Sequence, residues 1–230
     1  MLFRYFSMAK LTLAALQNKP TAQLDAQQVS AMDKYLILHA EHSLNLSTST
    51  ARIVASGESK MGGWHITVGA MQSLAGNRHG NAANEALENL KEIDKRYSGS
   101  VAEKVAAYIE HIEEAKAAAK GTVTKSADNW TDGTVPGFGH KIYSAKDPRA
   151  SALQAVLRST AQGESAVFAI AMELEKQLAA HPSFGQKQPK PIYPNVDFCS
   201  GVMLSQYLGI DPRLMTSMFG VSRNLGWMAH

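Results

Sequence analysis

The sequence predicts an all-α fold, and two kinds of observation support this. Apolar residues recur at helical spacing, as along residues 29–36, and no segment shows sustained alternation of apolar and polar residues. Helix start signals precede such stripes. Asp25 with Gln28, and Ser100 with Glu103, form capping boxes in which each side chain can bond the other residue's backbone N–H.

The helices are expected to follow one another with short breaks. The helix from Leu46 is expected to end near Gly57 and the helix from Trp64 near Gly76, because glycine often follows the last helical turn. Residues 1–17 start apolar, but Arg4 interrupts the run and no signal-peptide cleavage site is evident, so a helix packed on its neighbours is expected. Further helices are expected to begin at Asp25, Asn81, Ser100, Asp147, Ser165, Asn195 and Pro212, with a loop over residues 120–136 and a linker over 181–194.

Length and composition exclude several classes of protein. A chain of 230 residues that is 45% hydrophobic and 19% charged can bury a core and is not disordered. The net charge of +3, without a basic run, does not favour nucleic acid as a partner. The single cysteine, Cys199, forms no internal disulfide and favours a reducing compartment such as the cytoplasm. No apolar run reaches the ~20 residues that span a bilayer, so no membrane partner is expected.

A glycine-rich turn and a helix start lie close together in the second half of the chain. Residues 135–140 read VPGFGH and end on His140, and residues 147–149 read DPR. Glycine lets the backbone approach a ligand, and an imidazole exchanges protons near neutral pH. Asp147 is a good N-cap, which puts Arg149 near the positive end of the helix and in the region of His140. This pattern predicts a carboxylate-binding site; the alternative is an ordinary glycine-rich turn.

Two histidine patterns have more than one interpretation. His39 and His42 are three residues apart at a helix end, where they can share a face and bind a metal. No third ligand stands at a recognised spacing, so no metal site is predicted. His79 precedes a helix N-terminus, which favours its neutral form. It can donate a hydrogen bond to a substrate oxygen or simply cap its own helix.

Asp197 and Arg223 are charged residues within apolar segments. Asp197 falls in the first turn of the helix expected from Asn195, where a carboxylate can simply satisfy backbone N–H groups. Arg223 needs an anionic partner if it is buried. The two residues alone leave a structural role open beside a functional one.

Five blocks of sequence, in the family's order, resemble the citrate synthase family. They are LHAEHSLNLSTSTAR (38–52), LAGNRHGNAANEAL (74–87), VPGFGHKIYSAKDPRA (135–150), PNVDFCSG (194–201) and FGVSRNLGWMAH (219–230). The resemblance implies a helical homodimer in which a large and a small domain close over the active site. Residues 1–82 would be part of the large domain, 83–212 the small domain, and 213–230 the return to the large domain.

The resemblance also implies a role for each matched residue. His79 matches the histidine that polarises the thioester carbonyl of acetyl-CoA, Asp197 the base that takes the methyl proton, and His140 the histidine on the oxaloacetate carbonyl. The residues matching the ligands of the oxaloacetate and citrate carboxylates are His42, Arg149 and Arg223. The residues matching the CoA-binding loop are Val135, Pro136, Gly137, Gly139 and Lys141. Acetyl-CoA is a substrate here, and no cofactor or metal is implied.

The implied reaction condenses acetyl-CoA with oxaloacetate to give citrate and CoA. A hydrogen bond to the developing enol oxygen narrows the pKa gap between a carboxylate base and a methyl group beside a thioester. Two alternatives remain open. One is 2-methylcitrate synthase, which uses propionyl-CoA with the same three catalytic residues, and the other is a non-catalytic helical interaction domain.

The chain departs from the family pattern in several places. The familiar HADHE reads HAEHS, so Ser43 replaces an acid beside His42, and Lys141 replaces the arginine that commonly follows GFGH. The chain also starts after several large-domain helices of the family, and it stops before the segment that brings an arginine into the partner's site. We therefore expect a piece of a longer protein or a trimmed paralogue. As it stands, it should be a poor catalyst or none, and it should associate into a dimer or larger species.

Overall fold

The computed structural model describes residues 7–57, 63–76, 80–119, 133–140, 143, 145–160, 165–185 and 191–230. Within these residues the regular structure is helical, apart from one isolated β-bridge between Phe138 and Pro194. The all-α prediction is confirmed. No helix among the described residues is long and apolar enough to cross a bilayer.

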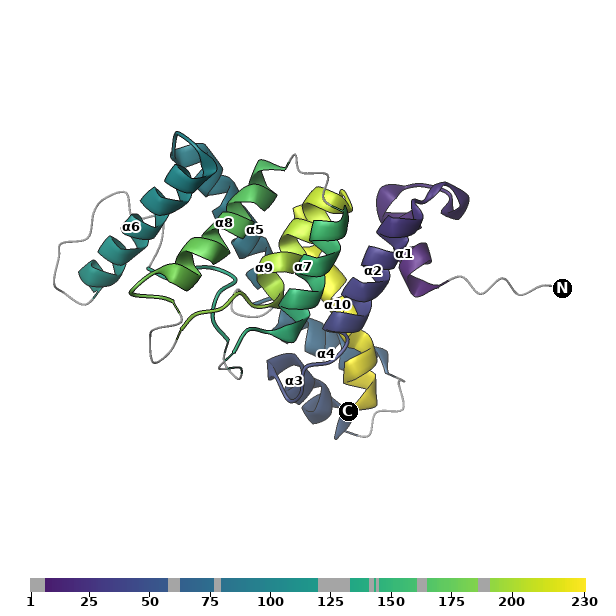
Figure 1. Ribbon diagram of the computed structural model, residues 1–230. Coiled ribbons are helices and arrows are strands. Elements are labelled where there is room, and N and C mark those ends of the chain that lie inside the picture. The colour runs from purple at the N-terminus through teal and green to yellow at the C-terminus, as the bar shows by residue number, and fades with distance from the viewer. Residues whose placement is uncertain are drawn as a thin grey trace.

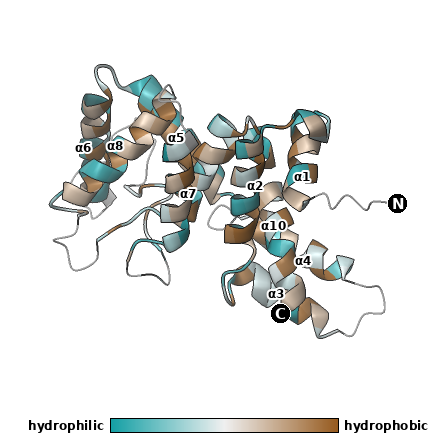
Figure 2. Ribbon diagram, turned by 45° about the vertical axis from the view of Figure 1, so that its right-hand side comes forward, coloured by the Kyte–Doolittle hydropathy of each residue, from teal (hydrophilic) through white to brown (hydrophobic). Residues whose placement is uncertain are grey.

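Ten α-helices are described. They are α1 (Met8–Gln17), α2 (Ala26–His39), α3 (Leu46–Ala55), α4 (Trp64–Leu74), α5 (Ala82–Arg96), α6 (Val101–Ala119), α7 (Pro148–Thr160), α8 (Ala166–Ala180), α9 (Val196–Val202) and α10 (Met215–Ala229). In Figure 1, α5, α6 and α8 pack at one end of the molecule, and α3 and α4 lie beside the C-terminal part of α10 at the other. Figure 2 shows that single helices such as α6 and α8 carry both apolar and polar residues, as amphipathic helices do.

Most of the expected helices begin at the capping side chains from which they were predicted. The Ser100 and Glu103 box is complete: the Ser100 N–H donates to Glu103 Oε2 at 2.7 Å, and the Glu103 N–H donates to Ser100 Oγ at 3.4 Å. Asp25 caps α2, but Gln28 Oε1 accepts the side-chain amide of Gln17 at 3.1 Å, and Gln28 Nε2 donates to the Tyr207 carbonyl at 2.9 Å. The expected return bond from the Asp25 N–H is wrong, because the oxygen that would accept it faces Gln17.

The N-cap of α5 also differs from the expectation. Asn81 stands at the predicted position, but its side chain accepts no capping hydrogen bond. Its own backbone is helical, with φ −84° and ψ −5°, whereas a capping side chain needs extended backbone to reach the N–H groups ahead of it. Residues 1–6 of the expected first helix, and most of the 120–136 loop, lie outside the described residues.

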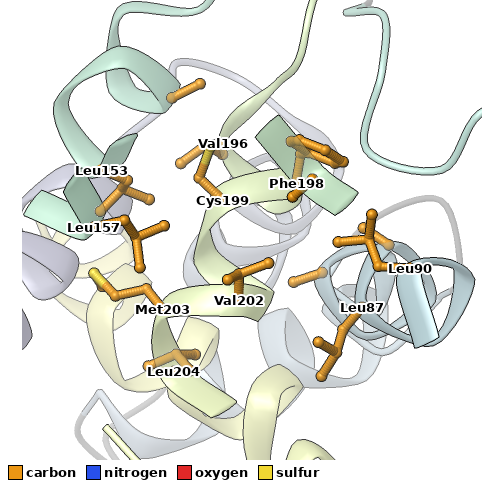
Figure 3. Close-up of a cluster of buried hydrophobic side chains, with 14 of the residues drawn as sticks. Leu87, Leu90, Leu153, Leu157, Val196, Phe198, Cys199, Val202, Met203 and Leu204 are labelled. Carbon is orange, nitrogen blue, oxygen red and sulfur yellow. The ribbon is translucent and has the colours of Figure 1, made fainter. Parts of the chain in front are cut away.

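The helix α9 lies at the centre of the larger of two buried apolar clusters. Figure 3 shows Leu153 and Leu157 of α7 on one side of α9 and Leu87 and Leu90 of α5 on the other. The chain continues from α9 into a π-helical turn, Met203–Tyr207, so the helix expected from Asn195 towards Leu208 is present with a wider last turn. The charged first turn of α9 is thereby held in place by a continuous apolar core.

The smaller cluster joins α3, α4 and α10. It consists of Ala51, Ala70, Leu74, Phe219 and Trp227. Helices α1 and α2 contribute instead to the larger cluster, together with the helices expected to form the small domain. The domain boundaries at residues 82 and 212 stay a prediction.

The glycine-rich turn is attached to the segment that precedes α9. The Gly139 N–H donates to the Tyr193 carbonyl at 2.8 Å, and the Asn195 N–H donates to the Gly137 carbonyl at 2.9 Å. Gly137 has φ +80°, and a Cβ there would lie 2.9 Å from Phe198 Cα and 3.1 Å from Ala86 Cβ. Glycine is therefore needed at 137 for close packing against α9 and α5.

Gly137→Ala should destabilise the fold more than Gly209→Ala does. Both glycines have positive φ, but a Cβ at Gly209 meets nothing within 4 Å. The strain of the left-handed backbone, about 1–2 kcal/mol, is common to both variants, and the overpacking at Gly137 adds about 1–3 kcal/mol. Urea unfolding of the two variants measures the difference. Equal losses of unfolding free energy in the two variants would contradict the prediction and show that α9 shifts to accommodate the added methyl group.

Candidate functional site

A cavity of about 690 Å³ lies between two sets of elements. The segment that joins α2 to α3, the start of α3 and the middle of α10 form one side, and the starts of α7 and α9 with the glycine-rich turn form the other. Figure 1 shows α7, α9 and α10 meeting near the middle of the molecule. Five residues singled out in the sequence line the cavity: His42, His140, Arg149, Asp197 and Arg223. The fold therefore gathers side chains from four blocks that are far apart in the chain.

The two cavity histidines contact each other. Their Nε2 atoms are 3.2 Å apart, and the Tyr143 ring centroid lies 4.5 Å from that of His140 and 5.5 Å from that of His42. His140 Nδ1 accepts the backbone N–H of Tyr143 at 3.0 Å. The neutral His140 ring therefore carries its proton on Nε2 and donates it to His42 Nε2.

Both imidazoles are held in the neutral form. Burial, supported by the charge of Arg149, lowers the pKa of His42 to about 4. Burial also lowers the pKa of His140, with Asp147 acting against the shift and Arg149 adding to it. At neutral pH these rings can give and accept hydrogen bonds without adding a charge to the cavity.

Arg149 is oriented by Asp147 at the start of α7. The Arg149 Nε is 3.1 Å from Asp147 Oδ1, and Nη2 is 2.8 Å from Oδ2, while the Arg149 N–H donates to the same carboxylate at 2.9 Å. Asp147 is 1% exposed; burial disfavours its charge, but the hydrogen bonds from Arg149 outweigh burial and lower its pKa. The two-point pair fixes the plane of the guanidinium at the cavity wall. The sequence placed Arg149 near His140 but did not predict this pair.

Arg223 is a buried cation in the middle of α10. It is 1% exposed, its Nε donates to the His39 carbonyl at 2.6 Å, and its guanidinium carbon lies 4.8 Å from the Phe219 ring centroid. Burial lowers its pKa to about 10, so it is still charged at neutral pH. No carboxylate of the described residues forms an ion pair with Arg223, which leaves the cation to be matched by an anion in the cavity.

Asp197 stands in the first turn of α9 without a capping role. The N–H groups of Asp197 and Phe198 donate to the side chain of Asn195, so the structural interpretation of Asp197 as a cap is wrong. Asp197 Oδ1 is shielded from solvent and has no hydrogen-bond partner among the described residues. Burial raises the pKa of Asp197 to about 6, with Arg149 and Arg223 acting against the shift. A carboxylate in this state is a stronger base than usual.

Known proteins resemble this chain in sequence and in fold. A family model described as the C-terminal domain of citrate synthase matches residues 4–230. The chain belongs to the citrate synthase family. Citrate synthase of a Synechocystis strain is 37% identical over 208 residues, which cover 90% of this chain and 45% of that protein. This chain spans about half the length of the curated relatives it matches.

Two solved citrate synthase structures extend the match to the fold. The enzyme from Pyrobaculum aerophilum has a TM-score of 0.75 at 32% identity, over 98% of this chain and 49% of that one. The enzyme from Thermoplasma acidophilum has a TM-score of 0.72 at 26% identity, over 97% of this chain and 52% of that one. The latter was solved as a ternary complex with carboxymethyl coenzyme A and oxaloacetate.

In this member of the citrate synthase family, His39 and His42 do not share a face. The helix α2 ends at His39, which is buried, stacks on Tyr35 at 4.1 Å between ring centroids and bonds the Tyr35 carbonyl through Nδ1 at 2.9 Å. His42 turns to His140 instead. No group of three potential metal-ligating side chains occurs in the described part of the chain.

Other residues suggested by the family resemblance are only partly placed. His79 and Lys141 lie outside the described residues. Val135 and Gly137 are buried against the core, Pro136 is half-buried, and Gly139 lines the cavity. Their role in CoA binding stays a prediction.

Sequence reasoning did not identify Asn45 or Asn195 as cavity residues. Both line the cavity, and each caps a helix: Asn45 accepts the Thr48 N–H at 3.1 Å at the start of α3, and Asn195 caps α9. Asn195 was recognised as a cap only. The sequence held one signal for these two residues: each is an N-cap within a block that resembles citrate synthase. The first turns of α3, α7 and α9 all line the cavity, so the caps of such helices are candidates for cavity residues.

His42 should remain neutral down to about pH 4, and Arg149→Leu should raise its pKa. Burial is the larger cause of the low value and persists in the variant, but the repulsion between the guanidinium and an imidazolium is lost. NMR titration of the imidazole signals measures the midpoint. Arg158→Leu, an exposed position near the end of the same helix, is the matched control and should leave the midpoint unchanged. A His42 midpoint near the ordinary 6.5 in the unmodified chain would contradict the geometry.

Proposed function

We propose that this chain carries the active site of a citrate synthase-type acyltransferase, which condenses acetyl-CoA with oxaloacetate to give citrate and CoA. One observation carries the proposal. Two cationic arginines, two neutral histidines and a carboxylate of raised pKa come from four family blocks into one cavity. Membership of the family, and the ternary complex known for the Thermoplasma acidophilum enzyme, support the same substrates.

The cations of the cavity match a dianionic substrate. Arg149 is held at the wall by Asp147, and Arg223 has no ion-pair partner among the described residues. We assign one carboxylate of oxaloacetate to each arginine, with His42 donating a further hydrogen bond. A bound dianion would offset the cost of keeping Arg223 charged in a buried position.

The proposed chemistry begins at Asp197. Its carboxylate takes a methyl proton of acetyl-CoA. The electrons of that C–H bond form a carbon–carbon double bond, and the π electrons of the thioester carbonyl move onto its oxygen, where His79 is proposed to donate a hydrogen bond. The resulting enol carbon attacks the ketone carbon of oxaloacetate, whose π electrons move onto the ketone oxygen. His140 donates a hydrogen bond from its Nε2–H to that oxygen as it becomes an alkoxide. Hydrolysis of the citryl-CoA thioester then releases citrate and CoA.

His140 must change its hydrogen-bond partner in this scheme. Its Nε2 is 3.2 Å from His42 Nε2, so the ketone oxygen of oxaloacetate replaces His42 as the acceptor. Because the pKa of His140 is lowered by burial, the ring acts as a neutral donor and not as an imidazolium. The charge that stabilises the alkoxide then comes from Arg149 and Arg223.

The remaining features follow the family. The reaction is proposed to need no cofactor or metal, with Val135, Pro136, Gly137, Gly139 and Lys141 in the loop that meets CoA.

The protein is proposed to be a homodimer in the cytoplasm. Exposed apolar side chains on α4 and α10 support the dimer, among them Trp64, Val68, Val221 and Leu225. Light scattering that gives the mass of a single chain would contradict the dimer.

A thiol-release assay on a full-length version of the protein tests the function, because the chain by itself is expected to be a poor catalyst or none. The full-length version should liberate CoA from acetyl-CoA only when oxaloacetate is present, because the enol forms productively next to its acceptor. Propionyl-CoA in place of acetyl-CoA separates citrate synthase from 2-methylcitrate synthase and should react more slowly. Absence of oxaloacetate-dependent CoA release with either acyl-CoA would refute the proposal, and faster release from propionyl-CoA would assign the alternative substrate.

Asp197→Asn and Arg149→Leu should fail in different ways. Asp197→Asn should lower kcat by about 10²–10⁴-fold, because the base is gone, yet leave the Kd for oxaloacetate nearly unchanged. Arg149→Leu should raise that Kd about ten- to a hundredfold, since the loss of a charged hydrogen bond costs roughly 1.5–3 kcal/mol. Calorimetry and thiol release measure the two quantities, with Arg158→Leu as the control. If both active-site variants lost oxaloacetate affinity equally, the assignment of roles would be wrong.

A further inference from the structure

Asn195 links the segment of the proposed base to the segment of the proposed donor. Its Oδ1 accepts the N–H groups of Asp197 at 3.0 Å and Phe198 at 3.4 Å, and its Nδ2 donates to the Gly139 carbonyl at 3.0 Å. Gly139 directly precedes His140. One primary amide therefore bonds the first turn of α9 and the end of the glycine-rich turn at the same time.

Helix capping alone does not account for an asparagine at this position. Serine, aspartate and asparagine cap helices about equally well, and Ser7, Asp25 and Ser165 cap other helices of this chain. Aspartate keeps no donor, and serine carries its O–H donor on the capping oxygen itself, whereas the amide carries its N–H₂ donor on a second atom that can reach a different segment. In Asn195 that donor is directed at Gly139.

The bond to Gly139 holds a part of the turn that packing does not hold. Gly137 is wedged against Phe198 and Ala86, whereas a Cβ built on Gly139 meets no atom within 4 Å. Gly139 has φ +83° and lines the cavity. Gly139 itself makes two hydrogen bonds: its N–H donates to the Tyr193 carbonyl at 2.8 Å, and its carbonyl accepts the Asn195 amide.

We infer that Asn195 is a positioning residue that fixes His140 relative to Asp197 across the cavity. The inference rests on the function proposed above, in which these two residues act on the two substrates. Condensation requires the enol carbon and the ketone carbon to meet, and a displacement of about 1 Å can cost on the order of a hundredfold in rate. Asn195 sets that spacing through a bond that does not involve either catalytic side chain.

Asn195→Ser separates the two functions of the amide. Its hydroxyl can still cap α9, but no donor reaches the Gly139 carbonyl. Amide hydrogen exchange at Gly139 and His140 should become at least about tenfold faster, while the amides of α9 keep their protection. In turnover, kcat should fall about ten- to a hundredfold, and the Kd for oxaloacetate should change much less because Arg149 and Arg223 stay in place. A purely structural role would instead speed exchange throughout α9.

Asp25→Ser is the matched control, because it makes a comparable exchange of cap residue at α2, remote from the cavity, and should change none of these quantities. Asn195→Asp is the second variant. It also keeps a cap and loses the donor, and it is judged by exchange alone because its charge lies beside Asp197. Unchanged exchange at Gly139 in both variants would overturn the inference. If a full-length version without these substitutions shows no oxaloacetate-dependent turnover, the proposed function fails, and the exchange data still decide whether Asn195 holds the turn.

Discussion

The burial of α9 between α5 and α7 is the constraint on which the site depends. The apolar core fixes this short helix along its length, and its first turn points into the cavity with Asp197. Because the same burial removes water from the carboxylate, it raises the pKa of Asp197 to about 6 while the neighbouring arginines keep it from rising further. Packing and acid–base chemistry are thus two consequences of one arrangement, and a change that loosens α9 should alter both.

The charges of the cavity are arranged for an anion. Arg149 is neutralised in part by Asp147, whereas Arg223 makes its close polar contact with a backbone carbonyl of His39. His42 and His140 are neutral and hydrogen-bonded to each other, so their N–H groups can be donated to a ligand without adding two more positive charges to the cavity. A buried guanidinium such as that of Arg223, which forms no ion pair with a carboxylate of the described residues, is costly to keep charged. The free-energy cost of burying Arg223 is explained if its guanidinium binds a carboxylate ligand.

Local signals predicted much of this structure, and contacts between distant segments account for the rest. The helix starts at Ser100, Ser165 and Asn195 follow from side chains that act within one turn, and the family blocks identified five residues that meet in the cavity. By contrast, the amide of Gln28 bonds Gln17 and the Tyr207 carbonyl instead of completing its capping box, and Arg223 donates to the carbonyl of His39. The side chain of Asn195 caps α9, so Asp197 does not have the capping role that its position suggested. Such outcomes depend on partners more than 100 residues away or on competition between neighbours, which spacing alone does not resolve.

The central claim is that this cavity binds oxaloacetate through the paired histidines and the two arginines. The most direct measurement is an imidazole NMR titration of the chain with oxaloacetate. The account predicts that the signals of His42 and His140 shift together as the ligand separates the pair, while His111, remote on α6, keeps its signal. It also predicts that Arg149→Leu moves the titration to about ten- to a hundredfold higher oxaloacetate concentration. Signals of His42 and His140 that stay unchanged at millimolar oxaloacetate would contradict the account.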